Sequence, residues 1–253
     1  MTSLNEPARF SPHQAIRLHW PEYLIEAFAL GMFMLSASVV TTLLQPAVSN
    51  AALRRALIGI CMGGTAVALM YSGWGKRSGA HMNPAVTLAF LSLKRISGVN
   101  TVFYIVAQFA GGYAGVLLSR LLLGRPFIAP PVEYIVTVPG PAGVGAAFAA
   151  EFAISFLMMF AILMISNDPR WSRCAGIAAG LLISGYVYFE SPLSGFSMNP
   201  ARTFASALPA QIWTGLWIYF TAPIIAMWLA ARAFHAVTPI ADRLHHLPKI
   251  VPA

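Results

Sequence analysis

The stretch SGAHMNPAVT, residues 78–87, has a counterpart in GFSMNPARTF, residues 195–204, and both contain Met-Asn-Pro-Ala. Each Asn-Pro-Ala opens a short apolar piece, residues 84–93 in the first case and residues 200–208 in the second. Pro84 and Pro200 suit the first position of a helix, where a missing N–H costs nothing. Asn83 and Asn199 suit the cap position before it. The pattern therefore predicts two short, capped helices.

The composition around these two stretches is that of a membrane protein. Of the 253 residues, 58% are apolar and 9% are charged, against roughly 25% charged in soluble domains. So few charges cannot cover a soluble surface, which excludes a cytosolic enzyme, a disordered chain, a coiled coil and a disulfide scaffold. The net charge is +8, but the basic residues lie between the apolar runs and form no continuous basic face. No nucleic-acid partner is therefore expected. Cys61 and Cys174 are interpreted as inert thiols.

Six apolar stretches are long enough, or nearly so, to cross a bilayer, which takes about 20 residues. They are residues 23–44, 56–74, 101–123, 143–166, 174–189 and 212–234. The pieces that follow Asn-Pro-Ala reach only halfway at about 1.5 Å per residue, so they are either interfacial or re-entrant. Glycines on the third and fifth spans predict close helix crossings: Gly111, Gly112, Gly115, Gly176, Gly180 and Gly185.

The chain also repeats itself. Each half has a span with a glutamate (Glu26 or Glu151), a second span, an Asn-Pro-Ala piece and a third span. Three spans are an odd number, so the second half must be inverted relative to the first, and the two short helices should meet near the midplane. The expected division is an N-terminal tail 1–20, repeats 21–123 and 143–236, a connecting loop 124–142 and a C-terminal tail 237–253.

The charges of the connecting segments predict the orientation. Six spans bring both tails to one side, and that side would hold eleven lysines and arginines. The other side would hold four, namely Arg54, Arg55, Arg120 and Arg125. Because basic loops stay in the cytoplasm, we expect cytoplasmic termini in a plasma or bacterial inner membrane, and an extracellular loop 124–142.

Two helix N-termini that meet at mid-membrane place two partial positive charges, roughly half an elementary charge each, at one point. Asn83 and Asn199 can use the side-chain oxygen on their own helix and leave the NH₂ group toward a lumen. A neutral molecule with an acceptor oxygen would be held there, whereas a cation would be repelled.

The two stretches resemble the signature loops of the aquaporin (major intrinsic protein) family, and the resemblance covers roughly residues 20–236. It implies an all-α membrane fold with six tilted spans and two re-entrant half-helices, one pore per subunit, a homotetramer, and no cofactor. The expected partners are the lipid bilayer, water and small neutral solutes. The resemblance also implies that buried Glu26 and Glu151 accept hydrogen bonds from the loops, and that His81 braces the first loop. No catalytic or metal-binding residue is expected.

The family's selectivity filter maps, by a count without gaps, onto Gly63, Val187, Phe196 and Arg202. A slip of one residue would select Met62 or Gly64 instead. Water-selective members usually carry phenylalanine, histidine and a small residue at the first three positions, and this chain differs at all three. Glycerol-conducting members usually carry an aromatic residue, a glycine and a phenylalanine at these positions. In this chain only Phe196 matches that set.

Other positions are similar to water channels: Thr203, Ala207, Tyr219, Phe220 and the short connecting loop. We therefore expect a passive channel for water and small uncharged solutes such as glycerol or urea, closed to protons and ions. A secondary transporter with alternating access is the alternative. An intramembrane enzyme is less consistent with the sequence, because His81 has no Asp, Cys or second His in its loop.

Overall fold

The computed structural model describes residues 11–238, and within them all regular structure is helical. Six long helices are long and apolar enough to cross a membrane. They are α1 (Pro12–Ala47), α2 (Ala51–Tyr71), α5 (Gly98–Leu123), α7 (Gly143–Asn167), α8 (Ala175–Phe189) and α11 (Leu216–Val237). The span that contains α8 begins at Ser172, because the 3₁₀ turn before the helix extends it. The shorter ones are α3 (Gly73–Ser78), α4 (Pro84–Ser92), α6 (Arg125–Ile128), η1 (Glu133–Ile135), η2 (Ser172–Cys174), α9 (Ser191–Ser194) and α10 (Pro200–Ala210). The predicted all-α fold with six spans is confirmed.

The first helix begins earlier than the hydropathy of the sequence predicted. Ser11 caps it, since its hydroxyl accepts a hydrogen bond from the Gln14 N–H at 3.3 Å, while the Gln14 side chain accepts one from the Ser11 N–H at 2.9 Å. Pro12 occupies the first turn. Residues 12–20, predicted as part of a tail, therefore belong to α1, because a capping box and not apolarity starts the helix. Residues 1–10 lie outside the described range.

Local capping also explains the other shifted boundaries. Helix α2 ends at Tyr71, because Ser72 is extended and its hydroxyl accepts the Gly75 N–H, which starts α3. The predicted connecting loop 124–142 is not irregular throughout, since it contains α6 and η1. Of the predicted C-terminal tail, residues 237–253, Val237 is the last residue of α11 and Thr238 caps it. The residues after Thr238 lie outside the described range.

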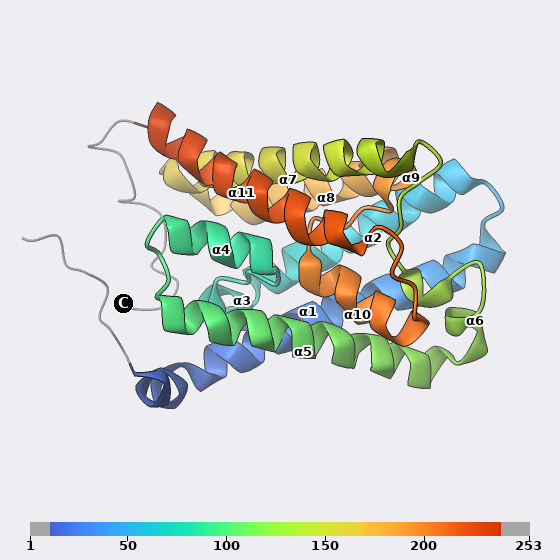
Figure 1. Ribbon diagram of the computed structural model, residues 1–253, viewed down its shortest axis with the longest axis horizontal. Coiled ribbons are helices and arrows are strands. Elements are labelled where there is room, and N and C mark those ends of the chain that lie inside the picture. Colours follow the sequence, from blue (N-terminus) through green and yellow to red (C-terminus); the bar gives the residue numbers. More distant parts are fainter. Residues whose placement is uncertain (1–10, 239–253) are drawn as a thin grey trace, which may run out of the picture.

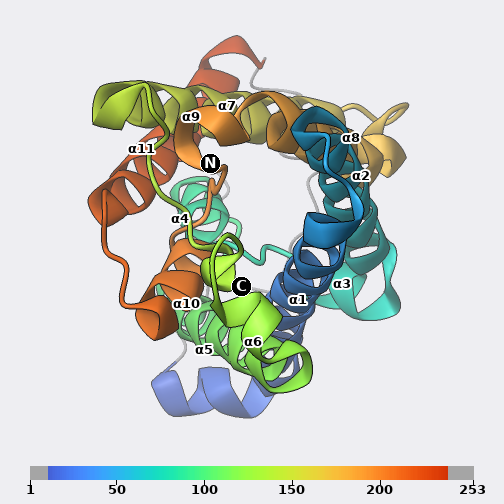
Figure 2. The same ribbon diagram turned by 90° about the vertical axis from the view of Figure 1, so that its right-hand side faces the viewer.

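The helices show the predicted repeat. The first and third spans of each half pack together, as α1 with α5 and α7 with α11, and the second spans, α2 and α8, pack across the two halves. Seen along the bundle, the helices form a ring around the two inner loops (Figure 2). The start of α1 and the end of α11 lie at the same end of the bundle (Figure 1), as an even number of crossings requires.

Glycines allow the closest of these contacts. A Cβ added at Gly111 would lie 2.0 Å from the main-chain oxygen of Ala27, and one at Gly115 would lie 2.3 Å from that of Gly31. Substitution at either position would push α5 away from α1. Gly185 differs from the prediction, because a Cβ there would meet no atom within 4 Å.

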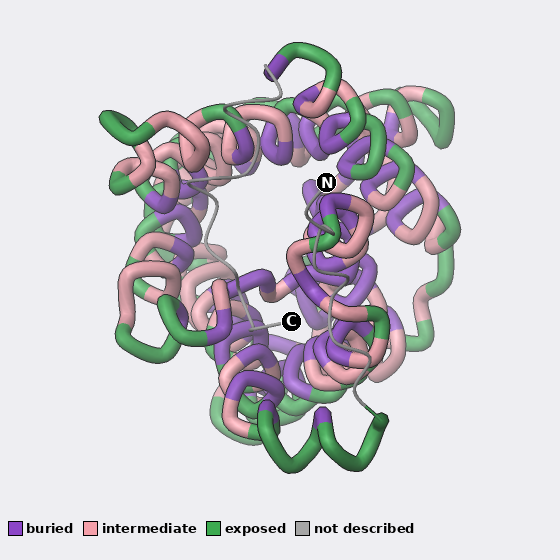
Figure 3. Tube along the Cα trace, turned by 90° about the vertical axis from the view of Figure 1, so that its left-hand side faces the viewer, coloured by how far each residue is buried: buried purple, intermediate pink, exposed green. Residues whose placement is uncertain are grey.

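The two short helices enter from opposite ends of the bundle, and their N-termini meet in its middle (Figure 1). Each packs more extensively on the third span of the other half than on that of its own, α4 on α11 and α10 on α5. Buried segments face the inside of the ring and exposed ones face outward (Figure 3). This exchange of half-helices places both Asn-Pro-Ala triplets at the centre of the molecule.

Candidate functional site

The loops that precede α4 and α10 share an unusual backbone. Ala80 and Met82 have φ values of 47° and 50°, and the corresponding Phe196 and Met198 have 57° and 54°. Non-glycine residues rarely adopt this left-handed region, and each such residue costs of order 1–3 kcal/mol. A loop with two of them needs strong local contacts to hold its shape.

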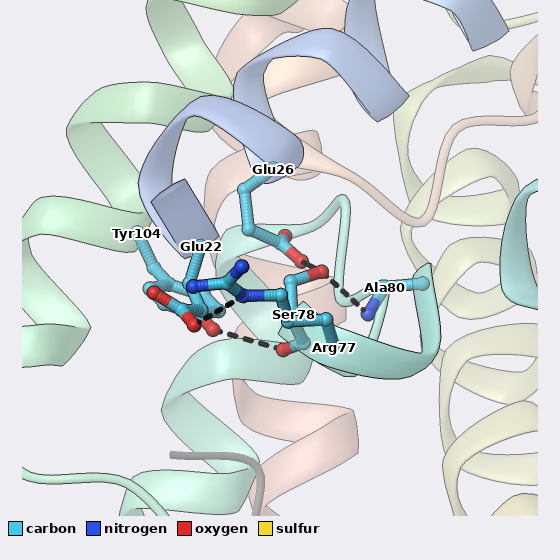
Figure 4. A network of polar contacts seen from close by, with 6 residues as sticks. All are labelled: Glu22, Glu26, Arg77, Ser78, Ala80 and Tyr104. Carbon is cyan, nitrogen blue, oxygen red and sulfur yellow. Dashed lines mark hydrogen bonds and ion pairs between the residues drawn. The ribbon is translucent and has the colours of Figure 1, made fainter. Parts of the chain in front are cut away.

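Glu26 supplies these contacts to the first loop. It is fully buried, and its carboxylate accepts hydrogen bonds from the N–H groups of His81 at 3.0 Å and Met82 at 2.7 Å. The Ser78 hydroxyl donates a third bond at 2.8 Å and itself accepts the Ala80 N–H (Figure 4). An acceptor at this depth therefore pairs the main-chain donors that the loop cannot pair internally.

Glu151 does the same for the second loop. It is also fully buried, and it accepts the N–H groups of Ser197 and Met198, both at 2.7 Å, together with the Ser194 hydroxyl at 2.7 Å. Ser194 in turn accepts the Phe196 N–H at 3.1 Å. The two glutamates thus make equivalent contacts in the two halves.

A tyrosine from each third span completes this arrangement. The Tyr104 hydroxyl donates to the main-chain oxygen of Ser78 at 2.8 Å, as Figure 4 shows, and the Tyr219 hydroxyl donates to that of Ser194 at 2.5 Å. Gln108 breaks the symmetry, because its amide contacts both Glu26 and Thr87, and Pro223 stands at the equivalent place of α11. The first loop is therefore held by one more side chain than the second.

His81 lies inside the first loop with 5% of its surface exposed. Its Nδ1 is 2.9 Å from the Thr87 hydroxyl, and its ring stacks on Phe90 with centroids 4.8 Å apart. In the second loop the Ser197 and Thr203 hydroxyls make the corresponding contact at 2.5 Å. Because Thr87 and Phe90 both belong to α4, His81 joins the loop to the half-helix that follows it, and this position suits the bracing role expected of it.

Asn83 and Asn199 cap their half-helices. The Asn83 side-chain oxygen accepts the Ala85 N–H at 2.8 Å, and that of Asn199 accepts the N–H groups of Ala201 at 3.0 Å and Arg202 at 3.2 Å. Each asparagine is 8% exposed, and Ala85 and Ala201 are fully buried. Pro84 and Pro200 occupy the first turns.

The sequence suggested that both side-chain amides point freely into a lumen. In the structure each amide donates one hydrogen bond to the opposite loop instead. Asn83 donates one N–H to the main-chain oxygen of Met198, and Asn199 donates one to that of Met82, both at 2.7 Å. An NH₂ group has two hydrogens, so one donor of each asparagine remains. The centre of the molecule thus combines two helix N-termini with two remaining amide donors, an arrangement that favours neutral acceptors and opposes cations.

Two of the four predicted filter residues, Val187 and Phe196, are enclosed, and a third, Arg202, lies in the first turn of α10. Val187 and Phe196 are 6% and 8% exposed and belong to one apolar cluster with Met198. Arg202 is partly exposed, and its Nη1 has no hydrogen-bond partner among residues 11–238. These residues offer an apolar surface and a free donor.

Gly63 has a different environment from the one the ungapped count suggested. A Cβ added there would lie 2.2 Å from the Ser184 hydroxyl oxygen and 2.3 Å from the main-chain oxygen of Gly180. Gly63 therefore provides the close contact of α2 with α8, and a side chain at this position would meet α8. Of the two alternatives, Met62 is 3% exposed and packs in a core cluster with Ala201, whereas a Cβ at Gly64 would meet nothing.

The sequence did not predict that several residues take part in this network: Ser78, Ser194, Thr87, Thr203, Tyr104, Tyr219 and Gln108. Of these, Thr203 and Tyr219 were noted only as positions similar to water channels. The two serines stand five residues before Asn83 and Asn199, so an alignment of the two loops could have found them. Gln108 has no counterpart to align. Within residues 11–238 the structure brings together no group of three or more His, Cys, Asp or Glu that could hold a metal ion.

Comparison with known proteins places this arrangement in a family. The family model described as "Major intrinsic protein" matches residues 14–234. A probable aquaporin of the NIP type from Nicotiana alata is 37% identical over 193 residues, 76% of this chain and 70% of that protein. Aquaporin NIP2-3 from Zea mays is 37% identical over 164 residues, 64% of this chain. The chain spans about half of this maize relative, 52% of its length.

The fold is also similar to that of a solved structure. The X-ray structure of the aquaglyceroporin from Plasmodium falciparum superposes with a TM-score of 0.77 and covers 89% of this chain and 99% of that one. The sequence identity is 18%, so the likeness concerns the fold.

Proposed function

Because this chain belongs to the major intrinsic protein family, we propose that it conducts water together with a small uncharged solute, glycerol or urea, and excludes protons and ions. Membership makes the chain an integral membrane channel for water or small neutral solutes, and not an enzyme. The choice of solutes, the filter and the assembly belong to the proposal.

The observation that carries the choice of solutes is the contrast between Arg202 and two other predicted filter residues, Val187 and Phe196. Val187 and Phe196 share one apolar cluster, and the Nη1 of Arg202 is a donor without a partner in the described part of the chain. A small polyol or amide could lie with its carbon edge on Phe196 while its oxygen accepts from Arg202. Val187 gives no hydrogen bond that would favour water alone.

Ion exclusion is supported by the centre of the molecule. The N-termini of α4 and α10 meet there (Figure 1), and their partial positive charges oppose a cation. Arg202 adds a positive group on α10. A cation would lose its water shell here without gaining acceptor oxygens in return.

Alternating access by a secondary transporter is less consistent with these contacts. Rocking of one repeat against the other is the usual form of that mechanism. Here the Asn83–Met198 and Asn199–Met82 hydrogen bonds join the two repeats at the midplane, and α4 and α10 each pack on the opposite repeat. The halves are therefore interlocked where they would have to separate.

We further propose a homotetramer with cytoplasmic termini in a cell membrane. Large apolar side chains on the outside of the bundle include Leu121, Leu181 and Phe189, with 80%, 68% and 77% of their surface exposed. Lipid or neighbouring subunits would cover such a surface. Native mass spectrometry of the protein released from detergent tests the oligomeric state.

Stopped-flow light scattering on proteoliposomes tests the proposal as a whole. We expect rapid water flow with a low activation energy, and non-saturating flux of glycerol or urea. A solute flux that saturates with concentration would favour a secondary transporter. Proteoliposomes that admit neither glycerol nor urea would indicate a channel for water alone. Appreciable proton current through the purified protein would contradict the exclusion of ions.

A further inference from the structure

Glu190 is a third buried glutamate and has no counterpart in the first repeat. It directly follows α8, its N–H donates to the Tyr186 oxygen at 2.8 Å, and it is 5% exposed. It stands three residues after Val187, and nine before Asn199, where the first repeat has the exposed Trp74. A buried carboxylate is costly unless it is paired.

The Glu190 carboxyl group is unpaired in the described part of the chain, because neither Oε1 nor Oε2 has a hydrogen-bond partner among residues 11–238. The Ser194 hydroxyl lies nearby, but it gives its single proton to Glu151 at 2.7 Å. Glu190 therefore lacks the donors that hold Glu151 in place.

The charged and titratable groups around it belong to four helices, α2, α7, α10 and α11. Glu151 of α7 and Arg202 of α10 interact electrostatically with Glu190, and Tyr219 of α11 senses its charge. From α2, the Arg55 guanidinium donates to the Tyr188 oxygen at 3.3 Å. Arg202 forms no ion pair within 4.0 Å in the described part of the chain, where the Arg77–Glu22 pair is the one found. Its positive potential thus depends on groups further away, with Glu151 first, then Tyr219 and Glu190.

We propose that Glu190 is a specificity-determining residue: its protonation state sets the electrostatic potential at Arg202 and with it the exclusion of cations. When the carboxyl group is neutral, Arg202 repels cations strongly. When the carboxyl group is ionised, its negative charge offsets the positive charge of Arg202, and the repulsion of cations weakens. The inference rests on the proposed function, in which Arg202 lines the conducting path.

The environment of Glu190 places this change in an accessible pH range. Burial, followed by repulsion from Glu151, raises the pKa of Glu190 to about 8. A raised pKa keeps the neutral form below about pH 8 and the ionised form above it. Cation exclusion should therefore be strongest below this pH and weaken above it.

Urea and guanidinium form a suitable probe pair, because they share size and planar shape and differ by one charge. Their fluxes are measured in proteoliposomes at pH 6 and pH 9.5, with water flow as the measure of channel content. For the wild type we expect the guanidinium-to-urea ratio to rise about tenfold or more at pH 9.5, because a unit charge acts strongly in a poorly solvated site. Glu190→Gln should keep a low ratio at both values, and Glu133→Gln, at an exposed glutamate, should behave as the wild type.

A ratio that does not change with pH in the wild type overturns the proposal, as does an unchanged rise in Glu190→Gln. Infrared spectroscopy gives a second readout without any solute. A protonated carboxyl band that disappears between pH 6 and pH 9.5 in the wild type and is missing in Glu190→Gln supports the assignment, and its absence from the wild type contradicts it. If urea does not pass, the proposed solute choice fails, and the infrared titration still decides the state of Glu190.

Discussion

The side-chain amide of Asn83 lies 2.7 Å from the main-chain oxygen of Met198 and donates a hydrogen bond to it. Asn199 makes the reciprocal bond to Met82 at the same distance. These bonds link the two loops directly, so the N-termini of the half-helices are fixed relative to one another. Each asparagine therefore acts as a helix cap and as a link between the repeats, and we propose its second N–H as a donor for a passing solute.

Replacing either asparagine by alanine should destabilise the protein beyond the loss of a cap. A cap alone is worth about 1 kcal/mol, and an oxygen of Met82 or Met198 left unpaired at this depth adds about 1–3 kcal/mol. Thermal unfolding in detergent measures the effect. Asn50→Ala is the matched control, because Asn50 caps α2 at an exposed position through the Leu53 N–H. Equal losses in the three variants would contradict a role in joining the loops.

Glu151→Ala should impair folding more than selectivity. Three donors, from Ser194, Ser197 and Met198, lose their acceptor, and each unpaired group costs about 1–3 kcal/mol. We expect a several-fold lower yield and a clearly lower melting temperature. Glu151→Gln retains one acceptor oxygen, so its yield and melting temperature should lie between those of the wild type and of Glu151→Ala. Glu133→Ala should leave both unchanged, because the Glu133 side chain is exposed. Normal yield, stability and permeability of Glu151→Ala would argue against the assigned support of the loop.

Two adjacent glycines of α2 should respond in opposite ways to alanine. A methyl group at Gly63 meets the main-chain oxygen of Gly180 at 2.3 Å, so α2 and α8 would have to separate, whereas one at Gly64 meets nothing within 4 Å. Overpacking of this kind costs about 1–3 kcal/mol, while an alanine in open helix gains up to about 1 kcal/mol. Melting temperatures should fall for Gly63→Ala and hold or rise for Gly64→Ala. Two similar results would mean that Gly63 is not a contact site.

The sequence predicted the fold well because the membrane constrains it strongly. Apolar length located the six spans, and the two Asn-Pro-Ala triplets located the half-helices. Where caps decide the boundaries, as at Ser11 and Ser72, hydropathy gave the wrong residue. The inverted arrangement of the repeats followed from an odd number of spans per half.

The contacts of the candidate site could be predicted only where the repeat supplied a second example. Glu26 and Glu151 stood out because charges are rare at membrane depth. Gln108 and Glu190 break the symmetry of the repeat, so no internal comparison could reveal them. Gly63 shows a further limit: a count along the sequence gives its depth on α2 but not the direction in which its Cβ would point.

Arg202→Gln should separate the contribution of the arginine to ion exclusion from that of the half-helices. Water needs no charged donor, so water flow should change less than twofold. Guanidinium or proton leak should increase, because one positive group is removed from α10. Current measurements on planar bilayers together with stopped-flow water permeability test both parts. Unchanged exclusion would show that the N-termini of α4 and α10 suffice alone.

Val187→Phe should reduce solute flux more than water flux. The added ring enters the apolar cluster that contains Phe196 and Met198, next to the surface on which we place the carbon edge of glycerol. A molecule with three carbons needs more of this space than water does, so we expect glycerol flux to fall about tenfold, of the order that one misplaced group costs in a fitted pocket. Stopped-flow measurements of both fluxes on one vesicle preparation give the ratio directly.

Leu181→Phe is the matched control for Val187→Phe, since Leu181 lies on the same helix and is 68% exposed. It adds a ring on the outside of α8 and should leave both fluxes unchanged. Equal losses of water and glycerol flux in Val187→Phe would indicate a general closure of the path or a disturbed fold, which the melting temperature would reveal. An unchanged glycerol flux in a folded Val187→Phe protein would place the solute path away from Val187, and the apolar side of the constriction would then have to be assigned to other residues.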